Sequence, residues 1–256
     1  MNRINKVFFS KKKNVLNIYF TAGYPKIDDT LRIARALQAA GTDIIEIGIP
    51  YSDPIADGTT IQYSSQKALD AGMSLKLLMI QLQDLRKYIS IPVILMGYIN
   101  PVLQYGFGKF CRDCKDVGID GVILPDLPMQ EYLETYQRTF EEYGIYNIFL
   151  ITPQTSERRI LRINEVSKGF IYMVSSASIT GAKQNVSQEQ VDYFARIQKM
   201  NLSIERLIGF GISNKETFKN ACKYASGAII GSAFINQLSK DASDGAIISF
   251  VGSIVN

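Results

Sequence analysis

The sequence predicts a (β/α)8 barrel, an eight-stranded parallel barrel wrapped in helices, with extended loops after the second and the sixth strand. Three observations carry this prediction. The chain has 256 residues, close to the roughly 250 that are typical of such barrels. Short β-branched runs alternate with amphipathic segments along its whole length. The runs are almost continuously apolar, as expected of parallel strands that are buried on both faces.

Eight apolar runs are predicted to be strands. They are residues 15–21, 44–49, 92–97, 121–124, 147–151, 170–175, 207–210 and 228–230. Helices are predicted for the amphipathic stretches 29–40, 75–89, 108–117, 130–143, 157–167, 188–200, 215–224 and 244–255. An open doubly wound sheet is the alternative. It would usually have fewer strands and a G-x-G-x-x-G turn after the first, whereas the turn here reads Thr21-Ala22-Gly23-Tyr24-Pro25.

The predicted helices begin and end at residues that favour caps. Asp28 or Asp29 precedes the first, Ser213 or Asn214 precedes 215–224, and glycines 41, 72, 118 and 144 stand where helices should end. Extra residues follow the second strand, in 50–72, and the sixth strand, in 176–187, where barrel enzymes place active-site loops. No linker or repeat divides the chain, so we expect residues 1–256 to form a single catalytic domain.

Composition narrows the chemistry that the chain can perform. It has no histidine, which excludes imidazole metal sites and Ser-His or Cys-His nucleophile pairs. Acid–base chemistry must therefore come from carboxylates, Lys, Tyr or Cys. A net charge of +4, spread along the chain, favours neither nucleic acid nor an anionic membrane as a partner. Three cysteines, no signal peptide and no long apolar stretch predict a cytoplasmic protein.

Glu46 is the first candidate for a catalytic residue. It is a lone carboxylate inside the predicted strand 44–49, on the same face as Ile44 and Gly48. If that face lines the barrel interior, burial should raise the pKa of Glu46 toward neutrality and suit it to general acid–base catalysis. A structural carboxylate, bonded to backbone amides or to a lysine, is the alternative interpretation.

The loop after this strand adds two more acids, Asp53 before Pro54 and Asp57 before Gly58. Either could simply belong to a turn. Together with Glu46 they would place two or three carboxylates at one mouth of the barrel. That arrangement favours proton transfer over a metal site, because acids spread over a strand and a loop have no defined ligand spacing.

Glycines and a serine follow the last two predicted strands, at Gly209, Gly211, Gly231 and Ser232. Loops after strands seven and eight, with a short helix N-terminus, form the recurrent phosphate site of this fold. The sequence therefore predicts a small phosphorylated substrate. The alternative is that these glycines only ease packing at the barrel rim.

The run 45–58 closely resembles the signature of the tryptophan synthase alpha subunit. It reads Ile45-Glu46-Ile47-Gly48-Ile49-Pro50-Tyr51-Ser52-Asp53-Pro54-Ile55-Ala56-Asp57-Gly58. Further matches extend the resemblance over nearly the whole chain, among them Phe20-Thr21-Ala22-Gly23-Tyr24-Pro25, Leu95-Met96-Gly97-Tyr98, Pro125-Asp126-Leu127-Pro128, Thr180-Gly181, Gly209-Phe210-Gly211-Ile212-Ser213 and Gly231-Ser232-Ala233. The carboxylate run is highly specific, whereas many phosphate-binding barrels share the glycine motifs.

The resemblance implies retro-aldol cleavage of indole-3-glycerol phosphate to indole and glyceraldehyde 3-phosphate, in an enzyme classified as a carbon–oxygen lyase. Glu46 would protonate C3 of the indole ring and help to deprotonate the glycerol hydroxyl, while Asp57 would hold the indole N–H. The phosphate would be bound by Gly181, Gly211, Gly231 and Ser232. The other implied positions are Tyr172 in the site, Thr180 closing onto the aspartate, and the indole walls Phe20, Ile61, Tyr98 and Phe210. Taken alone, Phe20 and Tyr172 would be ordinary core aromatics.

The resemblance also implies cofactors and a partner. This chain would hold no metal and no organic cofactor, whereas its beta partner would carry pyridoxal phosphate. Indole would pass through a tunnel to that beta subunit in an alpha2beta2 tetramer, with 50–53 and 100–106 facing the partner. Closure of 176–187 would exclude water and link the two sites. In this segment the sequence departs from the family, with no Arg after Ser175 and no Gly before Thr180.

Two other functions remain open at the level of the sequence. One is another phosphate-binding barrel, such as an isomerase of the same pathway, although the spacing of Glu46 and Asp57 argues against it. The other is a non-catalytic activator of a beta partner. The altered loop after the sixth strand supports that function, and the retention of both carboxylates opposes it.

Overall fold

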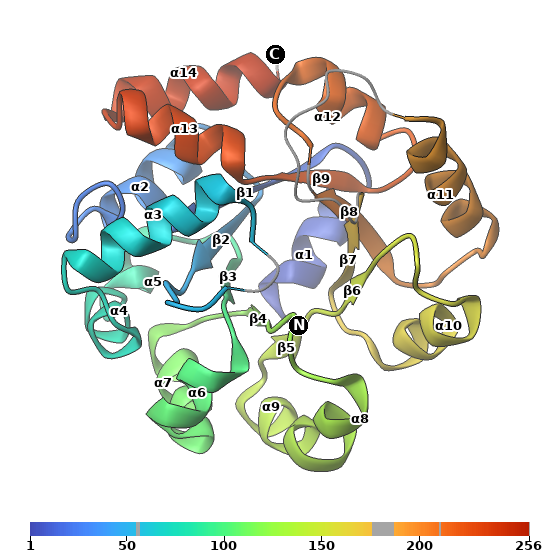
Figure 1. The fold of residues 1–256 in the computed structure, drawn as a ribbon, viewed down its shortest axis with the longest axis horizontal. Coiled ribbons are helices and arrows are strands. Elements are labelled where there is room, and N and C mark those ends of the chain that lie inside the picture. The colour runs from blue at the N-terminus through green and yellow to red at the C-terminus, as the bar shows by residue number, and fades with distance from the viewer. Residues whose placement is uncertain (55–56, 176–186, 210, 256) are drawn as a thin grey trace.

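The apolar runs pair side by side as parallel strands. The computed structural model describes residues 1–54, 57–175, 187–209 and 211–255, and within them the strand order is β5-β4-β3-β2-β1-β9-β8-β7-β6. The strands are β1 Val15–Thr21, β2 Ile44–Gly48, β3 Val93–Met96, β4 Gly121–Ile123, β5 Tyr146–Asn147, β6 Leu150–Ile151, β7 Phe170–Val174, β8 Glu205–Gly209 and β9 Gly227–Ile230. They surround the middle of the molecule, with most helices outside them (Figure 1).

β5 and β6 are two pieces of one barrel strand. The residues between them bridge the neighbouring strands, because the Ile148 amide donates to the carbonyl of Val122 and Phe149 accepts from the amide of Tyr172. β5 pairs with β4, and β6 pairs with β7. The chain from β5 to β6 therefore closes the ring, and the predicted (β/α)8 barrel is confirmed, with its fifth strand interrupted.

Helices follow the strands in the order that a barrel requires. Their bounds are α1 Arg3–Ser10, α2 Thr30–Ala39, α3 Thr59–Asp70, α4 Leu75–Gln81, α5 Leu85–Tyr88, α6 Ile99–Tyr105, α7 Phe107–Val117, α8 Met129–Glu131, the π-helical turn η1 Tyr132–Tyr136, α9 Gln137–Tyr143, α10 Glu157–Val166, α11 Gln188–Lys199, α12 Lys215–Ala221, α13 Ser232–Lys240 and α14 Asp244–Val255. Asp29 and Asn214 stand at the predicted helix starts. The predicted glycines 41, 72, 118 and 144 all have positive φ at or just after helix ends, as expected of C-terminal caps.

The segment 50–72 differs from the extended loop that the sequence predicts, because α3 occupies its second half. The buried residues of α3 are Ser64, Ser65 and Ala68, so the helix has no stripe of large apolar residues to reveal its period. The predicted helix 75–89 is likewise divided, into α4 and α5. The short helices α1, α6 and α13 were not predicted at all.

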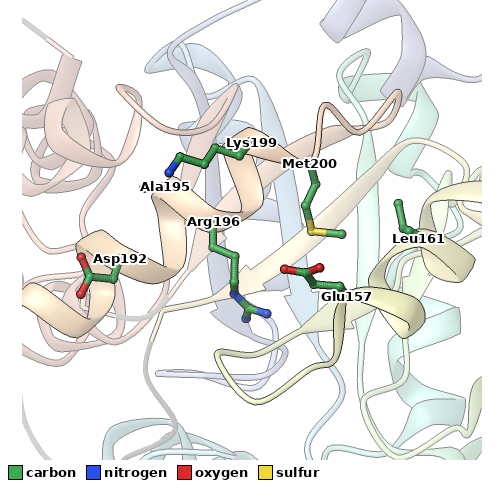
Figure 2. Close-up of a pocket in the computed structure, with 7 residues that line it drawn as sticks. All are labelled: Glu157, Leu161, Asp192, Ala195, Arg196, Lys199 and Met200. Carbon is green, nitrogen blue, oxygen red and sulfur yellow. The ribbon is translucent and has the colours of Figure 1, made fainter.

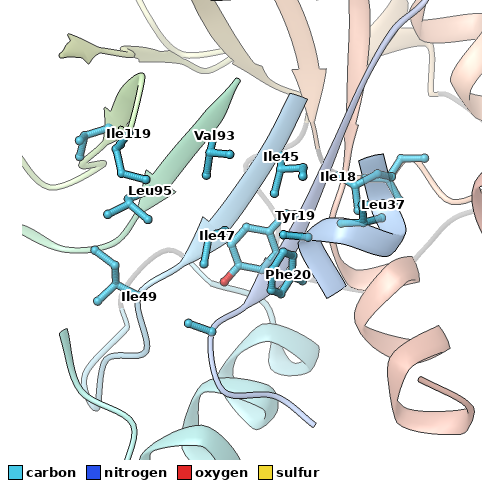
Figure 3. Close-up of a cluster of buried hydrophobic side chains, with 14 of the residues drawn as sticks. Ile18, Tyr19, Phe20, Leu37, Ile45, Ile47, Ile49, Val93, Leu95 and Ile119 are labelled. Atoms are coloured by element: carbon cyan, nitrogen blue, oxygen red, sulfur yellow. The ribbon is translucent and has the colours of Figure 1, made fainter. Parts of the chain in front are cut away.

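Alternate residues of each strand enter two different hydrophobic layers. The outer layer packs between strands and helices, and Figure 3 shows part of it, with Ile18, Phe20, Ile45, Ile47, Val93 and Leu95 from the strands and Leu37 from α2. The inner layer fills the barrel and includes Val15, Ile44, Ile94, Ile123, Phe170, Leu207 and Ile229. Ile4 and Phe8 of α1 belong to this inner layer. α1 therefore closes the floor of the barrel, at the amino ends of the strands (Figure 1).

A buried ionic network fastens this floor. Asp120, which is 3% exposed, accepts hydrogen bonds from Arg86 at 2.6 Å, from Arg3 of α1 at 3.0 Å and from the backbone amide of Val93 at 2.9 Å. The Arg86 guanidinium also donates to the carbonyls of Gly118, Ile89 and Ile91. One carboxylate therefore joins α1, α5 and the start of β3.

Asp120→Asn should destabilise the fold by about 3 kcal/mol, because removing one partner of a buried ion pair leaves the other charge unpaired. Urea unfolding at pH 7 measures the loss. Asp116→Asn makes the same change at an exposed position of α7 and should alter stability by less than about 0.5 kcal/mol. Equal effects of the two substitutions would contradict the assignment of the network.

Candidate active site

Glu46 faces the interior of the barrel, as the sequence predicts. It lies on β2 and is 1% exposed. Asn17 on the neighbouring strand β1 donates a hydrogen bond from Nδ2 to Glu46 Oε2 at 2.8 Å. The other oxygen, Oε1, is also buried and has no hydrogen-bond partner among the described residues. The carboxyl group is thus held through one oxygen only.

The burial of Glu46 changes its proton affinity. Loss of water around the carboxyl group raises its pKa from 4.5 to about 8, since burial disfavours the charged form. The hydrogen bond from Asn17 lowers this pKa, and the nearby charge of Asp57 raises it further. Glu46 is therefore mostly neutral at pH 7 and can both give and take a proton.

Asp57 stands at the same mouth of the barrel, just before α3. Tyr98, which follows β3, donates a hydrogen bond to Asp57 Oδ2 at 3.1 Å. Burial raises the pKa of Asp57, and the hydrogen bond from Tyr98 lowers it. Asp57 and Glu46 thus share one electrostatic environment, in which the charge of Asp57 opposes ionisation of Glu46.

Two further tyrosines enclose the carboxylates. Tyr172 on β7 is buried, and its pKa is raised by burial and by the charges of Glu46 and Asp57. Tyr19 on β1 is also buried, and burial together with the charge of Asp57 raises its pKa. Both phenols therefore stay neutral at physiological pH, and their hydroxyl groups line the site as uncharged polar groups.

Glycines make room for these two phenols. A Cβ atom at Gly48, on β2, would fall on the hydroxyl of Tyr19, and a Cβ atom at Gly209, on β8, would fall on the hydroxyl of Tyr172. Each phenol thus occupies space that a side chain on the neighbouring strand would otherwise fill. The shape of the site depends on this pairing of a small and a large residue on neighbouring strands.

The structure places Phe20, the predicted wall residue of β1, away from this group. Phe20 is fully buried in the outer hydrophobic layer, whereas the adjacent Tyr19 pairs in register with Glu46. Successive residues of a strand point to opposite faces, so Tyr19, and not Phe20, shares the interior face with Glu46. Tyr19 and Asn17 are not among the site residues that the sequence predicts, because the register of β1 with β2 places them on the inward face.

The predicted phosphate positions gather where β8 and β9 end. Gly231 and Ser232 begin α13, and a Cβ atom at Gly231 would lie 3.5 Å from Tyr19 and 3.6 Å from Ile61. Gly211 follows β8 with a φ of +76°. The N-terminus of α13 therefore lies next to the ring of Tyr19. Thr180, Gly181 and Phe210 lie outside the described residues.

A separate hollow of about 610 Å³ lies on the outer surface. Its lining residues come from the helical layer and are Glu157 and Leu161 of α10, Asp192, Ala195, Arg196 and Lys199 of α11, and Met200 (Figure 2). No strand end contributes to it. The two carboxylates thus belong to a different part of the molecule.

The described residues contain neither a metal-binding cluster nor a membrane-spanning helix. In the part of the chain that the structure describes, no three His, Cys, Asp or Glu side chains are grouped so that they could hold a metal ion. Across residues 1–54, 57–175, 187–209 and 211–255, no helix combines the length and apolar character needed to cross a membrane.

A parallel (β/α)8 barrel with buried carboxyl groups at the carboxyl ends of its strands is the architecture of a barrel enzyme. The family model described as tryptophan synthase alpha chain matches residues 6–248. A tryptophan synthase alpha chain of Flavobacterium johnsoniae is 55% identical over 254 residues, which are 99% of this chain and 100% of that relative. The chain belongs to the tryptophan synthase alpha chain family.

Solved structures agree with this assignment. The alpha subunit of Legionella pneumophila tryptophan synthase superimposes with a TM-score of 0.88 at 31% identity, covering 99% of this chain and 97% of that one. A chain of Mycobacterium tuberculosis tryptophan synthase, in its aminoacrylate-bound form, gives a TM-score of 0.86 at 29% identity, with coverages of 99% and 98%. Both likenesses extend over the whole barrel.

Glu46→Gln should stabilise the protein increasingly as the pH rises from about 4.5 to about 8. In this window the unfolded chain has released the Glu46 proton while the folded chain still holds it, so the wild-type protein loses stability with rising pH. The loss amounts to about 1.4 kcal/mol per pH unit and is absent from the glutamine variant. Urea unfolding of both proteins at pH 5 and pH 8 measures it.

Glu142→Gln provides the control, because Glu142 is exposed on α9. This substitution should leave the pH dependence of unfolding as it is in the wild type. A stability difference between wild type and Glu46→Gln that stays constant between pH 5 and pH 8 would contradict the raised pKa.

Proposed function

We propose that this chain is the lyase subunit that cleaves indole-3-glycerol phosphate to indole and glyceraldehyde 3-phosphate. The observation that carries the proposal is the buried Glu46, neutral near pH 7 and within the electrostatic influence of Asp57. A retro-aldol cleavage of this kind needs one group that gives and takes protons and another that stabilises positive charge. Membership of the tryptophan synthase alpha chain family supports the same reaction.

Glu46 supplies the proton transfers. As a neutral acid it gives its proton to C3 of the indole ring, which leaves the ring positively charged. As a carboxylate it then takes the proton of the glycerol hydroxyl. The O–H electrons form the aldehyde C=O, and the electrons of the broken C–C bond neutralise the ring. Glu46 ends the reaction in its starting state, so a single residue serves as both acid and base.

Asp57 stabilises the charge that forms on the ring. Its Oδ2 accepts a hydrogen bond from the hydroxyl of Tyr98, which fixes the orientation of the carboxylate. A fixed carboxylate beside the indole N–H becomes more favourable as the nitrogen gains positive charge. Such a preorganised group contributes to catalysis without reorganising during the reaction.

The remaining predicted residues would bind the substrate. Ile61, Tyr98 and Tyr172 would enclose the indole, together with Phe210. We propose Tyr19 as the wall from β1 in place of Phe20, since Tyr19 faces the interior. Gly181, Gly211, Gly231 and Ser232 would bind the phosphate, with the N-terminus of α13 supplying backbone N–H groups. Thr180 would close onto Asp57.

The cellular setting follows from the family. A beta subunit is the partner that an alpha chain implies, and we propose an alpha2beta2 tetramer in the cytoplasm in which indole passes to the beta subunit. Pyridoxal phosphate would belong to that subunit, because the chemistry assigned here needs only carboxyl and phenol groups. Residues 1–256 would act as one catalytic domain.

Glu46→Gln should lower indole release by about 10²–10⁴-fold, and Asp57→Asn by about 10²–10³-fold. The measurement is indole formation from indole-3-glycerol phosphate by the purified chain, with and without a beta subunit. Glu142→Gln and Asp70→Asn make the same chemical changes at exposed positions and should retain wild-type rates. Absence of indole release from folded wild-type protein in every mixture would reject the lyase and leave a regulatory barrel.

The rate of cleavage should depend on pH through both carboxyl groups. Glu46 must be protonated to start the reaction, so kcat/KM should fall as the pH rises through about 8. Asp57 must be ionised, so kcat/KM should also fall at low pH, at a value above that of an ordinary aspartate because burial raises its pKa. The bell-shaped profile of kcat/KM reports these groups in the free enzyme. A profile that stays flat between pH 7 and pH 9.5 would contradict the role of Glu46.

A further inference from the structure

Asn17 is a fully buried polar residue in the interior of the barrel. In the register of β1 with β2 it pairs with Ile44, while Tyr19, the next inward-facing residue, pairs with Glu46. Asn17 therefore lies on the floor side of Glu46, and its Nδ2 group reaches Glu46 Oε2 at 2.8 Å. The side of Glu46 toward the barrel mouth is the side away from Asn17.

The hydrogen bonds of this pair are incomplete. Asn17 Oδ1 and Glu46 Oε1 are both buried, and neither has a hydrogen-bond partner among the described residues. Buried polar atoms of a purely structural pair are normally satisfied. The carboxyl group of Glu46 is therefore held through Oε2, and its Oε1 is available for proton exchange.

We propose that Asn17 is a positioning residue that holds Glu46 through Oε2 and so makes Oε1 the oxygen that carries the exchangeable proton. In a protonated carboxyl group the carbonyl oxygen is the better acceptor, so the oxygen that takes the N–H bond favours the carbonyl form and the proton favours the other oxygen. The bond also fixes the rotation of the carboxyl group, and proton transfer depends on that alignment. The inference rests on the proposed lyase function for its substrate and on the structure alone for the Asn17–Glu46 pair.

Asn17 is the side chain whose hydrogen bond acts on Glu46. Asp57 is a carboxylate and only accepts hydrogen bonds when ionised. Tyr19 and Tyr172 are neutral phenols, and both remain in place when Asn17 is changed. Asn17 is therefore the donor whose removal changes Glu46 without altering the charge of the site.

The test replaces Asn17 by leucine, which has a similar size and no donor. Asn147→Leu is the matched control, because Asn147 is also a buried asparagine with an unsatisfied Oδ1 among the described residues. Two quantities are measured. One is the titration of the Glu46 carboxyl group, by infrared difference spectra against Glu46→Gln in the absence of substrate. The other is the pH profile of indole formation.

In Asn17→Leu the titration of Glu46 and the basic limb of kcat/KM should move upward together, by about one to two pH units, as expected for loss of a hydrogen bond to a charged group. The kcat value should fall at least about tenfold at every pH, with KM little changed, because the acid is no longer aligned. Asn147→Leu should show neither shift. A merely structural role for Asn17 would lower the amount of folded protein without moving either titration.

Asn17→Ser serves if Asn17→Leu does not fold, since serine is smaller and cannot reach Oε2 from the same backbone position. It should shift the Glu46 titration in the same direction. An unchanged infrared titration in a folded Asn17 variant would overturn the proposal. A shifted titration in an Asn17 variant, together with folded wild-type protein that releases no indole, would support the Asn17–Glu46 pairing and reject the lyase function.

Discussion

The desolvation of one carboxyl group underlies the rest of the active site. Glu46 is placed on the inward face of β2, where water is excluded and ionisation is unfavourable. An isolated charge in this position would be very costly, so the group is neutral near pH 7. That neutrality makes the residue useful as an acid. Burial thus sets the protonation state of Glu46, and Asn17 and Asp57 then shift its pKa further.

Stability and chemistry occupy opposite ends of the same strands. At the amino ends, α1 and the ion pairs of Asp120 with Arg3 and Arg86 seal the floor. Glu46 lies further toward the carboxyl ends, and Asp57 belongs to the loop between β2 and α3. This division is general in (β/α)8 barrels. In this chain it allows an unfavourable buried carboxyl group at one end to be compensated by packing and by paired charges at the other.

The sequence predicts the strands well, because continuous apolar runs leave little choice of structure. It also predicts the burial of Glu46, since a lone acid in such a run must face an unusual environment. The helix α3 was missed because its buried face consists of small residues. Tyr19 and Asn17 were missed because a strand's inward face is fixed only by its register with neighbours, which a single strand does not show. Thr180, Gly181 and Phe210 stay predictions.

The helix at the floor has a consequence for the mouth. Ile4 and Phe8 of α1 fill the barrel beside Ile44, two residues along β2 from Glu46, and the ring of Phe8 lies 6.0 Å from that of Phe170. These hydrocarbon side chains exclude water from the amino end of the barrel. The first ten residues therefore help to keep the pKa of Glu46 high, although they are far from it in sequence. Substitutions in α1 that let water reach the interior would lower the pKa of Glu46, without changing a residue at the barrel mouth.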